Sequence, residues 1–423
     1  MDISIKKTGD VSAEFTAPPS KSYTHRALIA AALADGTSFI RNPLISDDIK
    51  VTIDALRKLG VSIEQKDDFI LVKGTAGVLP DVGNITIDCK NSGTSLRHMT
   101  TFALLSPSEI TLTGSDRMLQ RPIGGLCDAL RQAGAEIDFM GEEGYPPIKI
   151  SGFFKGGRIA VDASKSSQFI SSIMICSPYA ESPVDIIPKG SVSSRSYVDI
   201  TTDIMRKFGA DVVYTPDKTW HVSQSVYLAT DYSVEGDYSS ASYFFAIAPV
   251  CRGSVTVNNL NISSVQGDQA FLIALSDMGC SVSKEGDSVR VDCSRSITGV
   301  ETDMSSCPDI VQTLCAVAPF AATKTIIRGI SHLRYKESDR IEAIEKMVTA
   351  SGCGFEKSED SISITPGPAH GFFIDPKDDH RTAMSSAVIG LGAGGVTIKD
   401  AECVSKSFPR FWDELRRAGL LKE

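Results

Sequence analysis

Helical segments with one apolar face recur along the chain, and each ends at a glycine. In the copy "DIKVTIDALRKLG", Val51, Ala55 and Leu59 fall on one helical face because they are spaced four residues apart. Glycine at the end of such a segment favours a left-handed C-cap, after which the pattern predicts a strand. Successive copies lie 67 to 75 residues apart and end at Gly60, Gly134, Gly209, Gly279, Gly352 and Gly419.

A second type of helical segment keeps the same period but is apolar on nearly every side. Examples are "SKSYTHRALIAAALA" and "DYSSASYFFAIAPV", and the copies begin in stretches rich in Ser, Asp, Asn or Gly. A helix that is apolar all round is expected to be buried. Short segments such as "VSIEQKDDFILVKG", with turn residues in the middle, predict pairs of strands between the helices.

These two landmarks predict an α/β fold of six units of about 70 residues, each with a buried helix, a half-exposed helix and several strands. Two domains of three units are expected, since 423 residues exceed one ordinary core. The chain is expected to cross between the domains at Pro18–Pro19 and again near "SVEGDYSSAS". The predicted domains are 19–234, and 1–18 together with 235–423.

Composition and charge narrow the classes of partner. The formal charge of −9 leaves no global basic field, so neither nucleic acid nor an anionic membrane is expected. The start "MDISIKKTGD" lacks the apolar stretch of a signal peptide, and the apolar runs are too short to span a membrane, so we expect a cytoplasmic location. The ten cysteines contain no CxxC pair and are expected to be buried thiols, without disulfides or zinc.

Basic residues gather at the starts of the buried helical segments. The first turn of a helix carries unpaired N–H groups and a partial positive charge, so converging helix starts form an anion site. Capping explains the hydroxyl side chains there but not the cations beside them. Arginine binds phosphate and carboxylate with paired hydrogen bonds, so several arginines indicate a ligand with more than one anionic group. The cations are Lys21, Arg26, Arg97, Arg121, Lys165, Arg334, Lys336, Arg340, His380, Arg381 and Lys406.

The segment "GLGAGG" matches a dinucleotide-binding pattern by its letters only. A helix pattern precedes it and the strand pattern "VTIKD" follows, which reverses the order that a dinucleotide site requires. The sequence has no clear P-loop, HExxH or GxSxG motif and no visible cluster of metal ligands. We therefore expect no cofactor and no metal.

The residues singled out above also carry a resemblance that runs nearly end to end. The motifs in chain order are "PPSKSYTHRAL", "NSGTSLR", "LQRPI", "SSQF", "SRSYVDIT", "EGDYSSASYF", "PDIVQTL", "RYKESDR", "DDHRTAM" and "KSFPRFW". With these motifs the chain resembles the 5-enolpyruvylshikimate-3-phosphate (EPSP) synthase family. The resemblance implies two inside-out α/β (inverse barrel) domains, each of three βαβαββ-like repeats, with a cleft between them. It also implies a monomer that transfers the enolpyruvyl group of phosphoenolpyruvate to the 5-hydroxyl of shikimate 3-phosphate and releases phosphate.

The resemblance further implies roles for individual residues. The expected catalytic residues are Asp309 as the base on the hydroxyl, and Glu337 and Lys21 as proton carriers. The residues expected to bind shikimate 3-phosphate are Lys21, Ser22, Arg26, Ser166, Ser167, Gln168, Ser194, Tyr197, Asp309 and Lys336. The residues expected to bind phosphoenolpyruvate are Lys21, Asn91, Gly93, Arg121, Gln168, Arg340, Arg381 and Lys406.

Some positions depart from the family pattern, and two other functions stay open. His332 stands where the family often has Asn, and "SRSY" replaces the common "SKPY" but keeps Ser194 and Tyr197. Gly93 is the residue expected of family members that glyphosate inhibits. The first alternative is the sister transferase acting on UDP-N-acetylglucosamine, although its usual loop with a catalytic Cys finds no match here. The second is a non-catalytic binder of phosphorylated metabolites, which would lack the acid–base residues.

Overall fold

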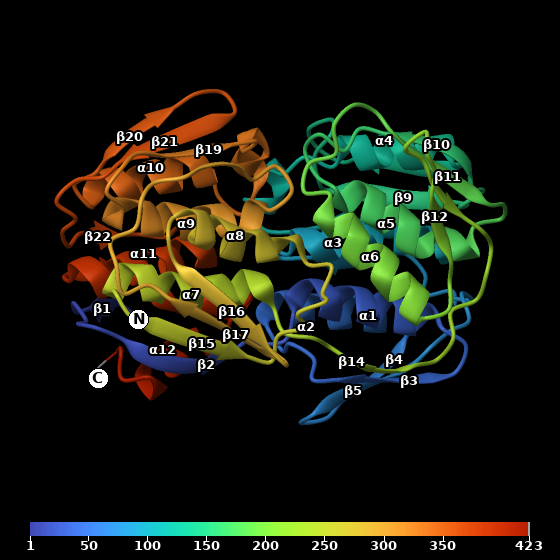
Figure 1. The fold of residues 1–423 in the computed structure, drawn as a ribbon. Helices are drawn as coiled ribbons and strands as arrows, with labels where there is room; N and C mark the ends of the chain where they lie inside the picture. The colour runs from blue at the N-terminus through green and yellow to red at the C-terminus, as the bar shows by residue number, and fades with distance from the viewer. Residues whose placement is uncertain (422–423) are drawn as a thin grey trace. The chain divides into compact units, whose positions relative to one another are not determined.

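The computed structural model describes residues 1–421 and separates into two compact units (Figure 1). The N-terminal unit comprises Pro19–Val234, and the C-terminal unit comprises Met1–Pro18 and Glu235–Glu423. Each unit has its own core of buried apolar side chains. All ten cysteines are buried free thiols, as the sequence predicts. None of the helices in residues 1–421 combines the length and the apolar character that crossing a membrane requires.

One strand pattern repeats through the sheets of both units. In one sheet, β6 (Ile85–Asp88) runs parallel to β7 (Ile110–Thr113), while β9 (Ile148–Gly152) is antiparallel to β7 and to β8 (Ala135–Phe139). The same order and directions recur in every four-stranded sheet of the described residues. The repeat predicted from helix patterns is therefore also present in the strand pairing.

In the N-terminal unit, three helices are buried on nearly all sides and three are amphipathic. The buried helices are α1 (Lys21–Leu33), α3 (Gly93–Phe102) and α5 (Gln168–Cys176). The amphipathic helices are α2 (Asp47–Lys58), α4 (Gly124–Gln132) and α6 (Ser196–Lys207). The other strands are β3 (Thr37–Arg41), β4 (Ser62–Gln65), β5 (Phe69–Lys73), β10 (Gly157–Val161), β11 (Val184–Pro188), β12 (Val212–Tyr214), β13 (Trp220–Val222) and β14 (Asp231–Ser233).

The C-terminal unit repeats this arrangement. Figure 1 shows its buried helices α7 (Tyr238–Cys251), α9 (Val311–Val317) and α11 (His380–Ala393) inside the unit, with strands β15–β17 on one side and β19–β21 on the other. The outer helices are α8 (Ala270–Asp277), α10 (Arg340–Ala350) and α12 (Phe411–Arg417). The strands are β1 (Ile3–Ile5), β2 (Ser12–Thr16), β15 (Ser254–Asn258), β16 (Ser281–Glu285), β17 (Ser288–Asp292), β18 (Glu301–Asp303), β19 (Thr325–Arg328), β20 (Gly354–Lys357), β21 (Ser361–Thr365), β22 (Phe373–Ile374) and β23 (Val396–Ile398).

Two sheets take a strand from a distant part of the sequence. β2 pairs in parallel with β15, and β14 pairs in parallel with β3. In the other four-stranded sheets, the corresponding strand comes directly before the buried helix of the same repeat. The chain leaves one unit for the other after Pro18 and again after Val234, directly before α1 and α7.

The last repeat differs from the sequence prediction. The pattern predicts a strand after Gly419, but residues 420 and 421 form none. Instead β1 lies antiparallel to β23, which pairs in parallel with β22. The N-terminal strand therefore completes the sheet of the C-terminal repeat.

The helix-ending glycines behave as predicted. Their φ angles are 88°, 95°, 88°, 108°, 88° and 72° in chain order from Gly60 to Gly419. A side chain is strained in this left-handed region, so glycine is favoured where each of these helices ends and the chain changes direction.

Candidate active site

Arg26, one turn into α1, is a buried cation whose hydrogen-bond acceptors are all neutral. Its exposed fraction is 1%, and burial lowers the pKa of its guanidinium to about 10. The acceptors are Thr201 Oγ1 at 2.7 Å, Ser22 O at 3.0 Å, Tyr197 O at 3.2 Å and Ser171 Oγ at 3.4 Å. A buried charge is costly without a counter-charge, so this place favours an anionic ligand. Arg26 also links α1 to α5 and α6 through these hydrogen bonds.

Ser194, in the same part of the N-terminal unit, has an unusual backbone conformation. Its φ of 58° lies in the left-handed region, although it is not a glycine. Its hydroxyl is buried and finds no hydrogen-bond partner among the described residues. Strained residues with unsatisfied polar atoms are typical of ligand sites. Tyr197, three residues later, contributes its carbonyl to Arg26. Ser166 and Ser167 are buried at the start of α5.

Gly93 opens α3 directly against the guanidinium of Arg121. A Cβ atom at position 93 would lie only 2.5 Å from Arg121 Nη2 and 2.7 Å from its Cζ. Arg121 is 3% exposed, and its Nη1 donates to the carbonyl of Asn91 at 3.4 Å. The predicted neighbours Asn91, Gly93 and Arg121 are therefore brought together, and the missing side chain lets the arginine approach the helix start.

Lys21 pairs with a carboxylate that the sequence argument missed. Its Nζ lies 3.2 Å from Asp48 Oδ2, and the two side chains are 15% and 7% exposed. Asp48 stands in the first turn of α2, where an acidic residue also suits the helix dipole. That position made Asp48 look like an ordinary helix-start residue, so only the fold reveals it as the partner of Lys21.

In the C-terminal unit, Asp309 is held by two arginines. Arg340 Nη1 lies 2.8 Å from Asp309 Oδ1, and Arg381 Nη2 lies 2.7 Å from Asp309 Oδ2. The two arginine side chains are 2% and 5% exposed, whereas the Asp309 side chain is 20% exposed. Three residues predicted to act in one reaction, on three different segments, are therefore in direct contact.

Two further carboxylates complete this cluster around Arg340. Glu337 Oε2 lies 2.5 Å from Arg340 Nη2, and Asp379 Oδ2 lies 3.4 Å from Arg340 Nε. Burial alone would lower the pKa of Arg340, but Glu337, Asp379 and Asp309 outweigh it and raise that pKa. Asp379 caps α11 by accepting from the Arg381 N–H at 3.0 Å. Asp379 is not among the site residues predicted from the sequence, although an acidic residue directly before a buried helix is a capping signal.

Three other candidate residues lie in the same unit. Lys406 is 6% exposed, and Lys336 is partly buried directly before Glu337. His332 is 3% exposed, and burial, aided by Lys336, lowers its pKa to about 3. Its Nε2 is enclosed without a hydrogen-bond partner among the described residues. His332 is therefore a neutral imidazole with one unused polar atom.

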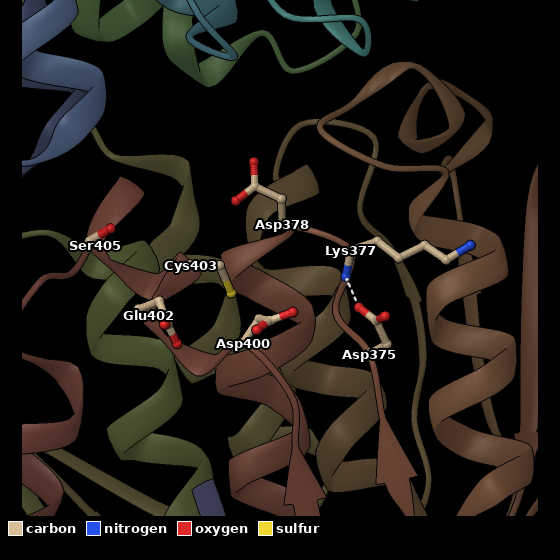
Figure 2. A pocket seen from close by; sticks show the side chains of 7 residues that line it. All are labelled: Asp375, Lys377, Asp378, Asp400, Glu402, Cys403 and Ser405. Carbon is tan, nitrogen blue, oxygen red and sulfur yellow. Dashed lines mark hydrogen bonds between the residues drawn. The ribbon is translucent and has the colours of Figure 1, made fainter. Parts of the chain in front are cut away.

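A cavity of about 530 Å³ in the C-terminal unit has the wrong charge for an anion. Figure 2 shows its lining side chains, which are Asp375, Lys377, Asp378, Asp400, Glu402, Cys403 and Ser405. The lining has four carboxylates and a single lysine, and the backbone N–H of that lysine donates to Asp375 Oδ1 at 3.0 Å. In residues 1–421, no group of three or more His, Cys, Asp or Glu side chains could hold a metal ion. We assign no substrate to this cavity.

Comparisons with known proteins match the chain over its whole length. A family model described as EPSP synthase (3-phosphoshikimate 1-carboxyvinyltransferase) matches residues 5–415. A 3-phosphoshikimate 1-carboxyvinyltransferase from Methanoculleus marisnigri is 52% identical, with 100% of both chains covered. One from Serratia proteamaculans is 39% identical over 96% of this chain and 95% of its own. A solved EPSP synthase from Acinetobacter baumannii has a TM-score of 0.82 at 27% identity, covering 99% of this chain and 98% of its own.

Proposed function

The chain belongs to the EPSP synthase family, and from this premise we propose how its residues transfer the carboxyvinyl group of phosphoenolpyruvate to the 5-hydroxyl of shikimate 3-phosphate. The reaction releases phosphate and belongs to aromatic biosynthesis. The sister activity on UDP-N-acetylglucosamine is not favoured, since the family model and the relatives all carry the shikimate activity. The acid–base residues are present, which also argues against a non-catalytic binder.

The observation that carries the assignment of roles is the cluster of Asp309 with Arg340 and Arg381. It combines cations suited to phosphate and carboxylate with a carboxylate suited to proton transfer, all within hydrogen-bond distance. A protein that only bound phosphorylated metabolites would have no use for carboxylates that compete with its ligand for the same arginines. The cluster therefore supports a catalytic site.

Shikimate 3-phosphate is proposed to bind through the helix starts of the N-terminal unit. Arg26 supplies a buried cation with neutral partners, which suits the 3-phosphate. The unused hydroxyl of Ser194 suits one of the phosphate oxygens. The other proposed contacts are Lys21, Ser22, Ser166, Ser167, Gln168, Tyr197, Asp309 and Lys336.

Phosphoenolpyruvate is proposed to bind through arginine side chains. Arg121 approaches Gly93 closely and presents a guanidinium beside the N–H groups at the start of α3. Arg340 and Arg381 supply two more guanidinium groups for its phosphate and carboxylate. The other proposed contacts are Lys21, Asn91, Gln168 and Lys406.

The proposed chemistry is an addition followed by an elimination. A proton from Glu337 or Lys21 adds to the methylene carbon of phosphoenolpyruvate and leaves cationic character at C2. The 5-hydroxyl attacks C2 as Asp309 takes its proton, which gives a tetrahedral intermediate. The group that gave the proton then takes one back from the methyl carbon while the C2–O bond to phosphate breaks, which restores the double bond. The arginines stabilise the departing phosphate, and the carboxylates stabilise the cationic carbon.

This scheme gives the arginine contacts of Asp309 a specific consequence. Both oxygens of Asp309 accept from arginines in this structure, and these two cationic contacts compete with transfer of a proton to the carboxylate. The phosphate and carboxylate of phosphoenolpyruvate can accept those N–H donors instead. Substrate binding would thus release the base.

The proposed function is tested by mixing the purified chain with both substrates and following inorganic phosphate. Phosphate release that requires both substrates, together with formation of the enol ether product, is expected. Release from phosphoenolpyruvate alone, or none at all, would contradict the proposal. We further propose a monomer in a reducing cytoplasm, which the free buried cysteines support and which size-exclusion chromatography can test for the oligomeric state.

A further inference from the structure

Arg97 lies on α3, four residues after Gly93, and is 4% exposed. Its Nη1 donates to Gln168 Oε1 at 2.7 Å, across 71 residues of sequence. We propose that Arg97 is a positioning residue for the phosphoenolpyruvate site, which fixes the side-chain amide of Gln168 so that its N–H donors serve the ligand. The inference rests on the proposed function, in which Gln168 contacts the substrates.

The direction of the Gln168 amide follows from the chemistry of the guanidinium. Arginine has only N–H donors and no acceptor, so the amide oxygen must be the atom that faces Arg97. The amide nitrogen then points away from Arg97 and donates to Thr94 Oγ1 at 3.0 Å. One N–H of that nitrogen is left without a partner among the described residues. An anionic ligand needs such a donor, and a flipped amide would present an oxygen that repels it.

Arg97 also holds the segment that carries a second ligand-binding group. Its Nη2 donates to the carbonyl of Pro122 at 3.3 Å, directly after Arg121. Its Cζ lies 5.7 Å from the centre of the Phe169 ring, directly after Gln168. One buried guanidinium therefore fixes Gln168 and the peptide that follows Arg121, both relative to the helix that Gly93 begins. No contact of Arg97 with substrate is needed for this role.

A double-mutant cycle separates this role from simple packing. We would compare Arg97→Met, Gln168→Ala and the double variant with the unmodified chain, measuring the dissociation constant of phosphoenolpyruvate in the presence of shikimate 3-phosphate. Each single change is expected to weaken binding by about tenfold or more, as the loss of one hydrogen bond to a charged group does. If Arg97 acts through Gln168, the double variant should bind no more weakly than the weaker of the two single variants.

Two further variants keep the test decisive. Arg97→Lys retains a donor-only cation and should recover most of the affinity, which also covers the case in which Arg97→Met does not fold. Arg131→Met is the matched control, because Arg131 likewise donates to a backbone carbonyl (Ile137 O, 2.6 Å) and lies over an aromatic ring (Phe139, 5.1 Å). It should leave phosphoenolpyruvate binding unchanged while reporting the effect of such a loss on the thermal unfolding temperature.

The outcomes are distinguishable from those of the proposed function. The positioning role would be overturned if the two single changes raised the dissociation constant of phosphoenolpyruvate independently, so that their factors multiplied in the double variant. It would also be overturned if Arg97→Lys bound phosphoenolpyruvate no more tightly than Arg97→Met. In either case the wild-type chain would still turn over both substrates. A wild-type chain that neither binds phosphoenolpyruvate nor releases phosphate would overturn both proposals together.

Discussion

Replacing Gly93 with alanine tests the close approach of Arg121 to the start of α3. The added Cβ would lie 2.5 Å from Nη2, 2.7 Å from Cζ and 2.8 Å from Nη1 of that arginine. Ordinary contact begins at 3.4 Å, so the guanidinium must withdraw by 3.4 − 2.5 = 0.9 Å or rotate away. The atoms it meets are the far end of a flexible side chain, so we expect the fold to tolerate the change.

We expect the Gly93→Ala change to weaken the binding of phosphoenolpyruvate and to leave folding intact. Hydrogen bonds to charged groups contribute about 1.5–3 kcal/mol, and about 1.4 kcal/mol corresponds to a tenfold change in affinity. If the displaced Arg121 loses its bonds to phosphoenolpyruvate, the KM for that substrate should rise by about 10- to 150-fold. Alanine is also a better helix former than glycine, so the free energy of unfolding should not fall.

Steady-state kinetics with each substrate varied in turn would measure this effect. The matched control is Gly9→Ala, because a Cβ at position 9 would meet nothing within 4 Å. The control should leave both KM values unchanged. A folded Gly93→Ala variant whose KM for phosphoenolpyruvate stays within about twofold of the wild-type value would refute the reasoning, since tenfold is the smallest expected effect.

Four other expectations follow from the site. Asp309→Asn should lower the rate of phosphate release by about 100-fold or more, as loss of a general base does, without raising the KM for phosphoenolpyruvate; normal turnover would show that another group is the base. Arg26→Ala should mainly raise the KM for shikimate 3-phosphate, by about tenfold or more, and an unchanged value in a folded variant would remove Arg26 from that site. His98 is buried and its pKa is lowered to about 3, so below pH 6.5 the unfolded chain binds a proton that the folded chain does not. The free energy of unfolding should therefore fall by about 1.4 kcal/mol per pH unit as the pH drops from about 6 to 4. In denaturant titrations, His98→Gln should remove this part of the pH dependence. An unchanged slope of unfolding free energy against pH would contradict the expectation. Because position 93 is glycine, glyphosate is expected to inhibit the chain, and full activity at millimolar glyphosate would exclude this.

Most of the fold can be predicted from the repeated helix pattern of the sequence. The helix patterns are local, and a glycine at a helix end needs only its own backbone to explain it, so Gly60 and its five counterparts were predictable. Strand pairing across long separations is not local. The sequence places residues 1–18 in the C-terminal domain, but it does not show that β1 completes the last sheet, since the repeat predicts a strand after Gly419 instead.

The sequence predicts members of a candidate site but not the contacts between them. Cations at helix starts mark an anion site from sequence, because the cause lies within each helix. That Asp309 lies against both Arg340 and Arg381 depends on how three segments pack together. Asp48 and Asp379 were missed for the same reason, since each looks like a common helix-start acid until its cationic partner is known.

The two strands at the N-terminus set a constraint on how the chain can be made. The N-terminal unit is one unbroken segment, so all of its strands exist once Val234 has been synthesised. β1 and β2 leave the ribosome before any of it, but their partners β23 and β15 are made much later. The first eighteen residues therefore have no strand partners while the whole N-terminal unit is synthesised. The C-terminal unit can close only when the chain is nearly finished, and a nascent chain stopped before Val396 cannot place β1.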